Sequence, residues 1–301
     1  MIEMSIKKLV QYGRTTGLIE AEDEIYARNQ IMEVLNMSEY EEPGDITDAI
    51  SLEDTLNALT DYAAEHGILE NNSIVYRDLF DTRLMNCLMP RPSEVVKKFH
   101  GEYEKSPEDA TGYFYKLSQD SNYIRRYRVC KDLKWITKTE YGDLDITVNL
   151  SKPEKDPKAI AAAKTMKQSG YRSAFSVWKM SLRGPRQSSG KKQSPDHSVD
   201  LKRRILGFQY SPYVYYNEHC IVFNGNHTPM KIDRNTFKKL FDFVTMFPAL
   251  FSGIQRGSSN RRRIDPDPRY FQGGRYTFAM AKAPVEKCFT VNGYEDVEAG
   301  S

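Results

Sequence analysis

Apolar residues recur at helical spacing through the first 130 residues of the chain. The segment 52–63 sets three leucines and an alanine on one face of a helix. Ser51, with an acid three residues later, is a helix-start signal, and Gly67 is a helix-end signal. The same periodicity predicts helices over 21–35, 74–88 and 93–103, and one that begins at Ser106 and carries a core-forming aromatic stripe at 113–117.

Beyond residue 130 the pattern changes to short alternating runs. Residues 133–137 and 144–148 flank Tyr141-Gly142 and predict a hairpin. We also expect strands within 208–223 and at 276–280, and helices over 156–168 and 235–247, the latter capped by Asn235. The expected fold is therefore α+β, with a helical region over 1–130 followed by a mixed α/β-strand region over 131–301.

Two segments, 172–206 and 249–270, show no sustained period and are rich in arginine, lysine, serine and proline. Their basic runs, 202–204 and 261–263, suit phosphate contacts and base stacking, so a nucleic-acid-binding protein is one alternative. The net charge of the whole chain is only +2, and no nucleic-acid-binding motif frames these runs. We therefore expect no nucleic acid among the partners.

Composition favours a soluble, cytoplasmic protein. Of its 301 residues, 40% are apolar and 28% are charged. The chain has no run of 18 apolar residues that would predict a membrane span, and its first residues lack the apolar core of a signal peptide. The four cysteines form no CxxC pair, which favours free thiols in a reducing compartment over a zinc ribbon or a disulfide scaffold.

Several long blocks resemble the class II (Firmicutes-type) UDP-glucose–hexose-1-phosphate uridylyltransferases, or galactose-1-phosphate uridylyltransferases. They are MPRPS at 89–93, LDITVNLSKPEKDPKAIAAAK at 144–164, GFQYSPYVYYNEHCIVFNGNHTPMKI at 207–232, FQGGRYTFAMAKAP at 271–284 and GYEDVEAG at 293–300. Four of the five blocks lie beyond residue 130, on both sides of the two aperiodic segments. The resemblance implies that residues 131–301 form a strand-containing uridylyltransferase region, and it leaves a homo-oligomer possible.

The resemblance also implies a reaction in galactose metabolism. In this family a histidine attacks the α-phosphorus of UDP-glucose, glucose 1-phosphate leaves, and a uridylyl-histidine remains. Galactose 1-phosphate then takes the uridylyl group and becomes UDP-galactose. Replacing one displacement with two is usual in covalent catalysis, and neutral imidazole is available near neutral pH. UDP-glucose and galactose 1-phosphate are therefore the expected partners.

Tyr270 occupies the position of that nucleophile, because the family carries HDHFQGG where this chain has PRYFQGG. A phenol has a pKa of about 10, so we expect the chain as written to be inactive or nearly so. Gln272 matches the family's glutamine, whose amide can donate to a phosphate oxygen; otherwise it is a polar residue at a strand end. Gly273 and Gly274 either let the nucleotide approach the backbone or turn the chain.

Both aperiodic segments are compatible with a displaced reading frame. Written with the codons ATC CAA CGC GGA, residues 254–257 contain TCC AAC GCG GA one base on, which encodes the family's Ser-Asn-Ala-Asp. Synonymous codons likewise permit HDH before FQGG, and CLLC within 172–206. We therefore hypothesise compensated frameshifts over about 172–206 and 249–270. Divergence into basic loops is the alternative.

The resemblance leaves the metal and the end of the chain as expectations. The family's CxxC would supply half of a zinc site, but residues 173–177 offer no thiolate, so we predict no metal and no cofactor. His219 and His227 lie in a matching block, as structural residues or as ligands. The family continues beyond GYEDVEAG, so we expect a C-terminal truncation that exposes apolar surface. A non-catalytic sugar-nucleotide-binding remnant is a further alternative.

Overall fold

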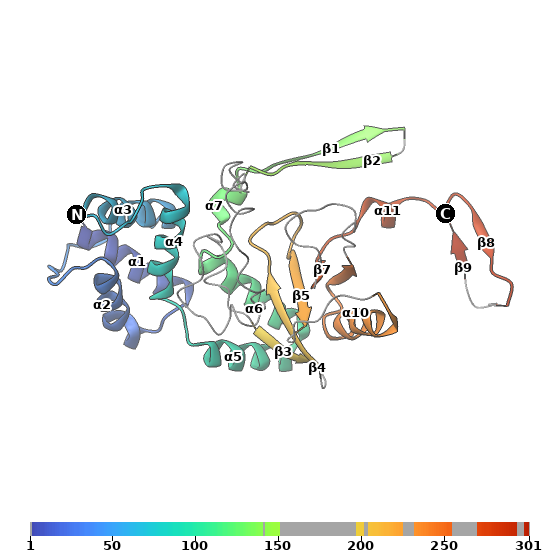
Figure 1. Ribbon diagram of the computed structural model, residues 1–301, viewed down its shortest axis with the longest axis horizontal. Coiled ribbons are helices and arrows are strands. Elements are labelled where there is room, and N and C mark those ends of the chain that lie inside the picture. The colour runs from blue at the N-terminus through green and yellow to red at the C-terminus, as the bar shows by residue number, and fades with distance from the viewer. Residues whose placement is uncertain are drawn as a thin grey trace, which may run out of the picture.

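A computed structural model of the chain describes residues 2–140, 142–150, 197–201, 204–224, 232–254, 270–293 and 298–300. It confirms the predicted α+β class, with helices first and strands after them (Figure 1). The first part contains α1 (Ile2–Thr16), η1 (Ala21–Asp23), α2 (Glu24–Val34), α3 (Leu52–Glu65), α4 (Ile74–Asn86), α5 (Pro92–Lys105), α6 (Pro107–Asp120) and α7 (Arg126–Val129). The helix predicted over 156–168 lies outside the described residues.

The predicted ends of α3 and the predicted start of α6 have the expected contacts. At the start of α3 the Ser51 side chain accepts a hydrogen bond from the Asp54 N–H, and at the start of α6 Ser106 accepts one from Asp109 in the same way. At the end of α3, Gly67 has a φ of +67°, and the Ile68 N–H donates to the Ala63 carbonyl at 2.8 Å. Glycine adopts this left-handed conformation without steric cost, which is why the helix stops there.

A five-stranded antiparallel sheet follows, in the order β3-β4-β5-β7-β6. Its strands are β3 (His197–Leu201), β4 (Arg204–Tyr210), β5 (Cys220–Asn224), β6 (Phe251–Ile254) and β7 (Tyr270–Gly274). The strand pair predicted within 208–223 is confirmed as β4 and β5. Both β3 and β6 fall in the segments that show no sustained period, because each strand is too short to produce one. β3 alternates Val199 and Leu201 with polar residues over only five positions, and β6 has four residues.

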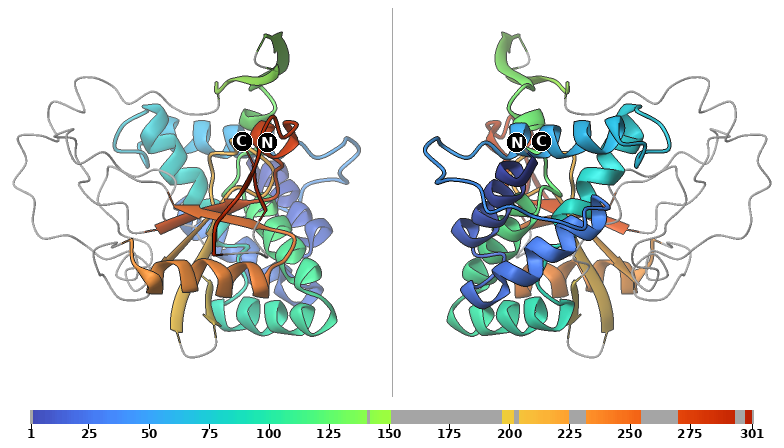
Figure 2. Two further views of the ribbon diagram at one scale, coloured as in Figure 1. Left: turned by 90° about the vertical axis from the view of Figure 1, so that its right-hand side faces the viewer. Right: turned by 90° about the vertical axis from the view of Figure 1, so that its left-hand side faces the viewer.

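One face of this sheet packs against helices α5, α6 and α10 (Arg234–Met246), as Figure 2 shows. Aromatic rings fill the contact. The ring centroid of Phe208 in β4 lies 5.5 Å from that of Phe114 in α6 and 5.6 Å from that of Phe247, and the centroids of Phe99 in α5 and Phe247 are 6.3 Å apart. These residues are all buried, and they belong to one hydrophobic core that continues into the helical part. The stripe at 113–117 is therefore core, as predicted, with Phe114 fully buried.

Two predicted elements are placed differently by the structure. The cap of α10 is Asp233 and not Asn235, because the Asp233 carboxylate accepts from the Thr236 N–H at 3.0 Å. The strand predicted at 276–280 is wrong: β7 ends at Gly274, and α11 (Ala279–Lys282) begins soon after. The rings of Tyr276 and Phe278 instead pack on each other, with centroids 5.0 Å apart, and both contact Tyr216.

The predicted hairpin is confirmed as β1 (Leu133–Thr139) and β2 (Gly142–Val148), which project from the rest of the molecule (Figure 1). Every residue of β1 is exposed. The register pairs Trp135 with Ile146 and Leu133 with Val148, so these four side chains share one face. We call it the apolar hairpin face. A second small hairpin, β8 (Cys288–Thr290) and β9 (Glu298–Gly300), lies near the end of the chain.

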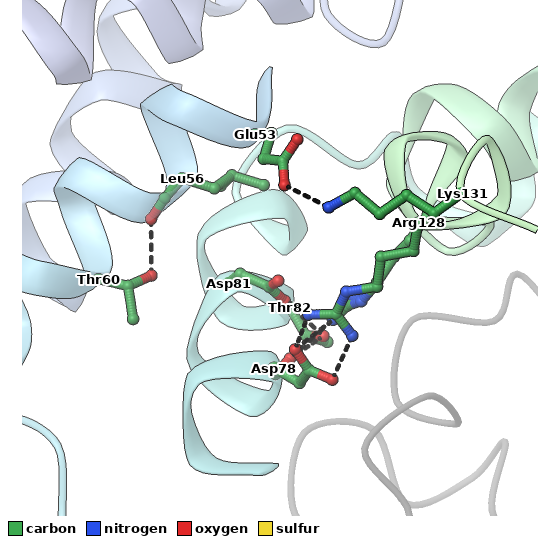
Figure 3. Close-up of polar contacts among 9 residues, drawn as sticks. Glu53, Leu56, Thr60, Asp78, Asp81, Thr82, Arg128 and Lys131 are labelled. Carbon is green, nitrogen blue, oxygen red and sulfur yellow. Dashed lines mark hydrogen bonds and ion pairs between the residues drawn. The ribbon is translucent and has the colours of Figure 1, made fainter. Parts of the chain in front are cut away.

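A buried ion-pair cluster joins α4 to α7 (Figure 3). Nη1 and Nη2 of Arg128 donate to the two carboxylate oxygens of Asp78, at 2.9 and 2.5 Å, and Arg125 pairs with Asp81 at 2.8 Å. Burial raises the pKa of Asp81 to about 7, against the opposing effect of Arg125. In the same view Lys131 pairs with Glu53 at 3.5 Å, with the Lys131 side chain exposed and that of Glu53 partly exposed.

None of the described helices is long and apolar enough to cross a membrane.

Candidate functional site

The FQGG block lies in β7, an interior strand of the sheet next to the edge strand β6. Strand β7 lies between β5 and β6, and Gln272 is paired with Ile221 on one side and Gly253 on the other. Residues opposite one another in an antiparallel ladder share a face. Phe271 is buried toward the helices, so Gln272 points to the opposite side of the sheet. We call this side, with Ile221, Gly253, Gln272 and Gly274, the outer face.

Tyr270 begins β7 and is paired with Phe223 of β5. Its backbone thus lies two residues before Gln272 on the same strand, as the family motif requires. The structure describes only the backbone of Tyr270. Gln272 itself is half-buried on the outer face.

Gly273 is glycine because the core leaves no room for a side chain. A Cβ there would lie 2.6 Å from the carbonyl oxygen of Phe251 and 3.0 Å from the Cys220 sulfur. The backbone oxygen cannot move aside without breaking the β6–β7 ladder. The expectation that this glycine turns the chain is wrong, because Gly273 lies within β7.

Gly274 is crowded from the other side of the strand. A Cβ there would lie 2.5 Å from Cε2 of Tyr216 and 3.1 Å from the Asn217 carbonyl. Gly274 also lies within β7, so it does not turn the chain either. What approaches both glycines in this structure is the protein itself. The close approach of a nucleotide to their backbone stays a prediction.

The loop between β4 and β5 is fixed beside this end of β7. Glu218 has a φ of +53°, a conformation uncommon for a residue other than glycine. Its buried carboxylate accepts from Nε of Arg275 at 2.7 Å and from the Tyr210 hydroxyl at 3.3 Å. The Arg275 N–H donates to the Asn217 carbonyl at 2.9 Å. These contacts hold the loop to the end of the sheet.

His219 is buried in that loop. Its Nδ1 lies 2.6 Å from the Tyr213 carbonyl, and its ring meets Tyr216 edge-on at 4.8 Å. Since a carbonyl only accepts, Nδ1 carries the proton and Nε2 is an acceptor. Burial lowers the pKa of His219, which keeps the ring neutral. The contact with Tyr213 therefore fixes the orientation of the ring.

The described residues do not fit a zinc site. They contain no group of three or more histidine, cysteine or acidic side chains placed to hold a metal ion. All four cysteines are free. Burial raises the pKa of the Cys87 thiol to about 12 and that of the Cys220 thiol further, so both stay protonated and are poor metal ligands. Several features singled out in the sequence lie outside the described residues: His227, residues 173–177, and the basic runs at 202–203 and 261–263.

The structure adds residues that the sequence pattern did not single out. Glu218, Arg275 and Tyr216 lie beside the FQGG block in space, although Tyr216 and Glu218 precede Gln272 by more than 50 positions. The only local signal is the position of Glu218 and His219 just before the apolar run of β5. Their contacts with β7 depend on the β5–β7 register, which no single-sequence pattern specifies.

Comparison with known proteins gives consistent results. The family model described as galactose-1-phosphate uridyl transferase, N-terminal domain, matches residues 17–229. The galactose-1-phosphate uridylyltransferase of Butyrivibrio fibrisolvens is 52% identical over 302 residues, covering 100% of this chain and 77% of that protein. The galactose-1-phosphate uridylyltransferases of Clostridium acetobutylicum and Caldanaerobacter subterraneus are 42% and 43% identical, covering 100% and 98% of this chain.

This chain spans 60% and 57% of the length of those last two relatives. No solved structure matches it. The family model covers more than half of the chain, and the similarity to the first relative extends over all of it. The chain therefore belongs to the galactose-1-phosphate uridylyltransferase family.

Proposed function

We propose that the outer face of β7 is the place where this protein exchanges UMP between UDP-glucose and galactose 1-phosphate, and that the chain as written performs this exchange poorly or not at all. The observation that carries the proposal is the setting of Gln272. It lies on β7, next to the edge strand β6, and its β6 neighbour Gly253 has no side chain to block the approach of a phosphate. An amide held there can donate to a phosphate oxygen as charge develops.

The exchange requires two displacements at the α-phosphorus of UDP-glucose. In the first, a bond forms between the nucleophile and phosphorus, and the bond to the glucose 1-phosphate oxygen breaks. In the second, a galactose 1-phosphate oxygen attacks the same phosphorus and expels the nucleophile. Tyr270 fills the nucleophile's position, and a phenol with a pKa of about 10 is protonated near neutral pH. Catalysis is therefore expected to fail at the first displacement.

The test is transfer from UDP-glucose to galactose 1-phosphate by three proteins. They are the chain as written, the Tyr270→His variant, and a chain with both aperiodic segments translated in the alternative frame. We expect robust transfer and a uridylylated protein, detected by mass spectrometry, only for the third, with Tyr270→His at most weakly active. Equal transfer by the chain as written would refute the role given to Tyr270 and remove the need for a displaced frame.

Binding without transfer is the second candidate function. It is favoured because Gln272 and both glycines keep their positions in β7 although the histidine is absent. Calorimetry with UDP-glucose distinguishes the two outcomes, because a binding remnant releases heat on mixing and a wholly defective chain does not.

We further propose a cytoplasmic location, a homo-oligomeric state and no bound metal. The four free thiols support a reducing compartment. The apolar hairpin face offers a surface for a second copy. The high pKa values of Cys87 and Cys220 argue against thiolate ligation. Native mass spectrometry and elemental analysis of the purified protein test the last two points.

A further inference from the structure

Aromatic side chains gather on the outer face, one step along the strand from Gln272. Phe251 is paired with Gly274, so it lies on that face, and Tyr216 packs against both of them. Tyr216 stacks on Tyr276 at 5.6 Å and meets Phe278 edge-on at 6.1 Å. We call these four rings the Tyr216 cluster. Residues i and i+2 of a strand are roughly 7 Å apart, so the cluster begins about one sugar ring away from Gln272.

The rim of this cluster is open to solvent. Phe278 is 46% exposed and Tyr215, next to His219, is 43% exposed. Large aromatic side chains usually bury most of their surface. Two exposed ones at the edge of a candidate site therefore indicate a surface that can bind a ligand with a flat apolar side. The hydroxyls of Tyr215 and Tyr276 add polar tips to the same surface, and the Tyr276 hydroxyl, which donates to the Asp145 carboxylate, keeps its oxygen as an acceptor.

His219 provides the second, independent observation. Its side chain is 97% buried, because its relative exposure is 3%. With Nδ1 bonded to the Tyr213 carbonyl, Nε2 is a buried acceptor that has no hydrogen-bond partner among the described residues. A buried acceptor left unpaired is costly, so such an atom calls for a functional account. The neighbouring ring of Tyr215, with its centroid 5.2 Å from that of His219, is 43% exposed, so the histidine lies beside a ring at the solvent boundary.

The frame beneath the cluster is rigid. The Glu218–Arg275 ion pair and the bond from the Arg275 N–H to the Asn217 carbonyl tie the loop to the end of β7. Tyr210 fixes the other carboxylate oxygen of Glu218 and bonds to the Thr111 carbonyl of α6. The rings are therefore positioned before any ligand arrives, which reduces the entropic cost of binding.

We propose that the Tyr216 cluster, with His219 at its base, is the subsite for the hexose ring of the sugar phosphate. This inference rests on the function proposed above, which puts the phosphate at Gln272. A hexose has apolar C–H faces that pack on aromatic rings, and hydroxyls that donate to an imidazole nitrogen and to phenol oxygens. The uracil ring of the nucleotide is flat as well, but it has a single N–H donor, so it matches this rim of several acceptors less well.

The experiment measures the binding of galactose 1-phosphate, of UMP and of inorganic phosphate to the full-length chain by calorimetry. The variants are Phe278→Ala, His219→Phe and His219→Gln, with Phe241→Ala as the matched control. Phe241 is 67% exposed on α10, on the far side of the sheet, so it tests the loss of an exposed ring as such. Thermal unfolding of each variant verifies that it is folded.

We expect Phe278→Ala and His219→Phe to weaken galactose 1-phosphate binding about tenfold, while UMP binding changes less than about twofold. His219→Gln, which keeps an acceptor, restores part of the affinity, as a purely structural role would not. Unchanged galactose 1-phosphate binding in Phe278→Ala overturns the proposal, even where His219→Phe fails to fold. Loss of UMP binding alone assigns the cluster to the base and also overturns it. If the unaltered chain binds neither UMP nor galactose 1-phosphate, the proposed function fails first.

Discussion

The five-stranded sheet and the β1–β2 hairpin are built from similar residues but differ in what covers them. In the sheet, Phe208 is 2% exposed under the rings of α6 and α10, whereas Trp135 in the hairpin is 48% exposed. Both lie in antiparallel strands with alternating apolar residues. Local alternation thus specifies a strand with an apolar face, and only the neighbouring elements decide whether that face becomes core.

The largest effect in this comparison is expected from Phe208→Ala. The ring centroid of Phe208 lies within 6 Å of those of Phe114, Tyr210, Phe243 and Phe247. Removing this ring leaves a cavity, because the surrounding helices cannot all move inward to fill it. We expect a loss of about 4 kcal/mol of unfolding free energy, measured by chemical denaturation. Trp135→Ala is the matched control, with an expected change below about 1 kcal/mol. Similar losses in both variants would show that the hairpin is as well packed as the sheet.

A buried ion pair should behave differently from an exposed one. Arg128→Met leaves the Asp78 carboxylate, whose side chain is 8% exposed, without its bidentate partner. We expect a loss of about 3 kcal/mol, because the buried carboxylate then keeps only its longer pair with Arg125, at 3.7 Å, among the described residues, and a poorly compensated buried charge is expensive. The control, Glu53→Gln, breaks the exposed pair with Lys131 and should cost less than about 1 kcal/mol. The double variant Asp78→Asn, Arg128→Met should recover part of the loss, and an additive result would contradict the pairing.

Asp81 gives the same cluster a dependence on pH. Burial raises its pKa from 3.8 to about 7, so between these values the folded chain keeps a proton that the unfolded chain has released. The unfolding free energy therefore falls as the pH rises through this window, by up to about 1.4 kcal/mol per pH unit, and levels off above it. Asp81→Asn cannot titrate and should flatten this slope in denaturation curves taken from pH 4 to 8. An unchanged slope would assign the dependence to another group.

The sequence predicted the elements whose signals are local and failed where partners lie far along the chain. Ser51 and Gly67 bound α3 through contacts within a few residues, so both ends of that helix were predictable. The contact of Asp78 with Arg128 spans 50 residues, and no pattern in α4 indicates that its acidic side chains are buried. At the site, the FQGG block was predictable by resemblance. The packing of Tyr216 on Gly274, which decides that the residue must be glycine, was not.

The smallest effect on stability, and the sharpest test of the comparison, is expected at the apolar hairpin face. An isolated two-stranded ribbon is marginally stable, so an exposed face with Leu133, Trp135 and Val148 gains by packing against a second copy. We expect Trp135→Ser to lower self-association in sedimentation velocity over a range of concentrations, with little change in unfolding free energy. Ile136→Ser is the matched control, because Ile136 is 63% exposed but pairs with Asp145 on the opposite face. If Ile136→Ser dissociates the protein and Trp135→Ser does not, the polar face of the hairpin is the one that self-associates. The apolar hairpin face would then not act as a sheet face that a second copy covers.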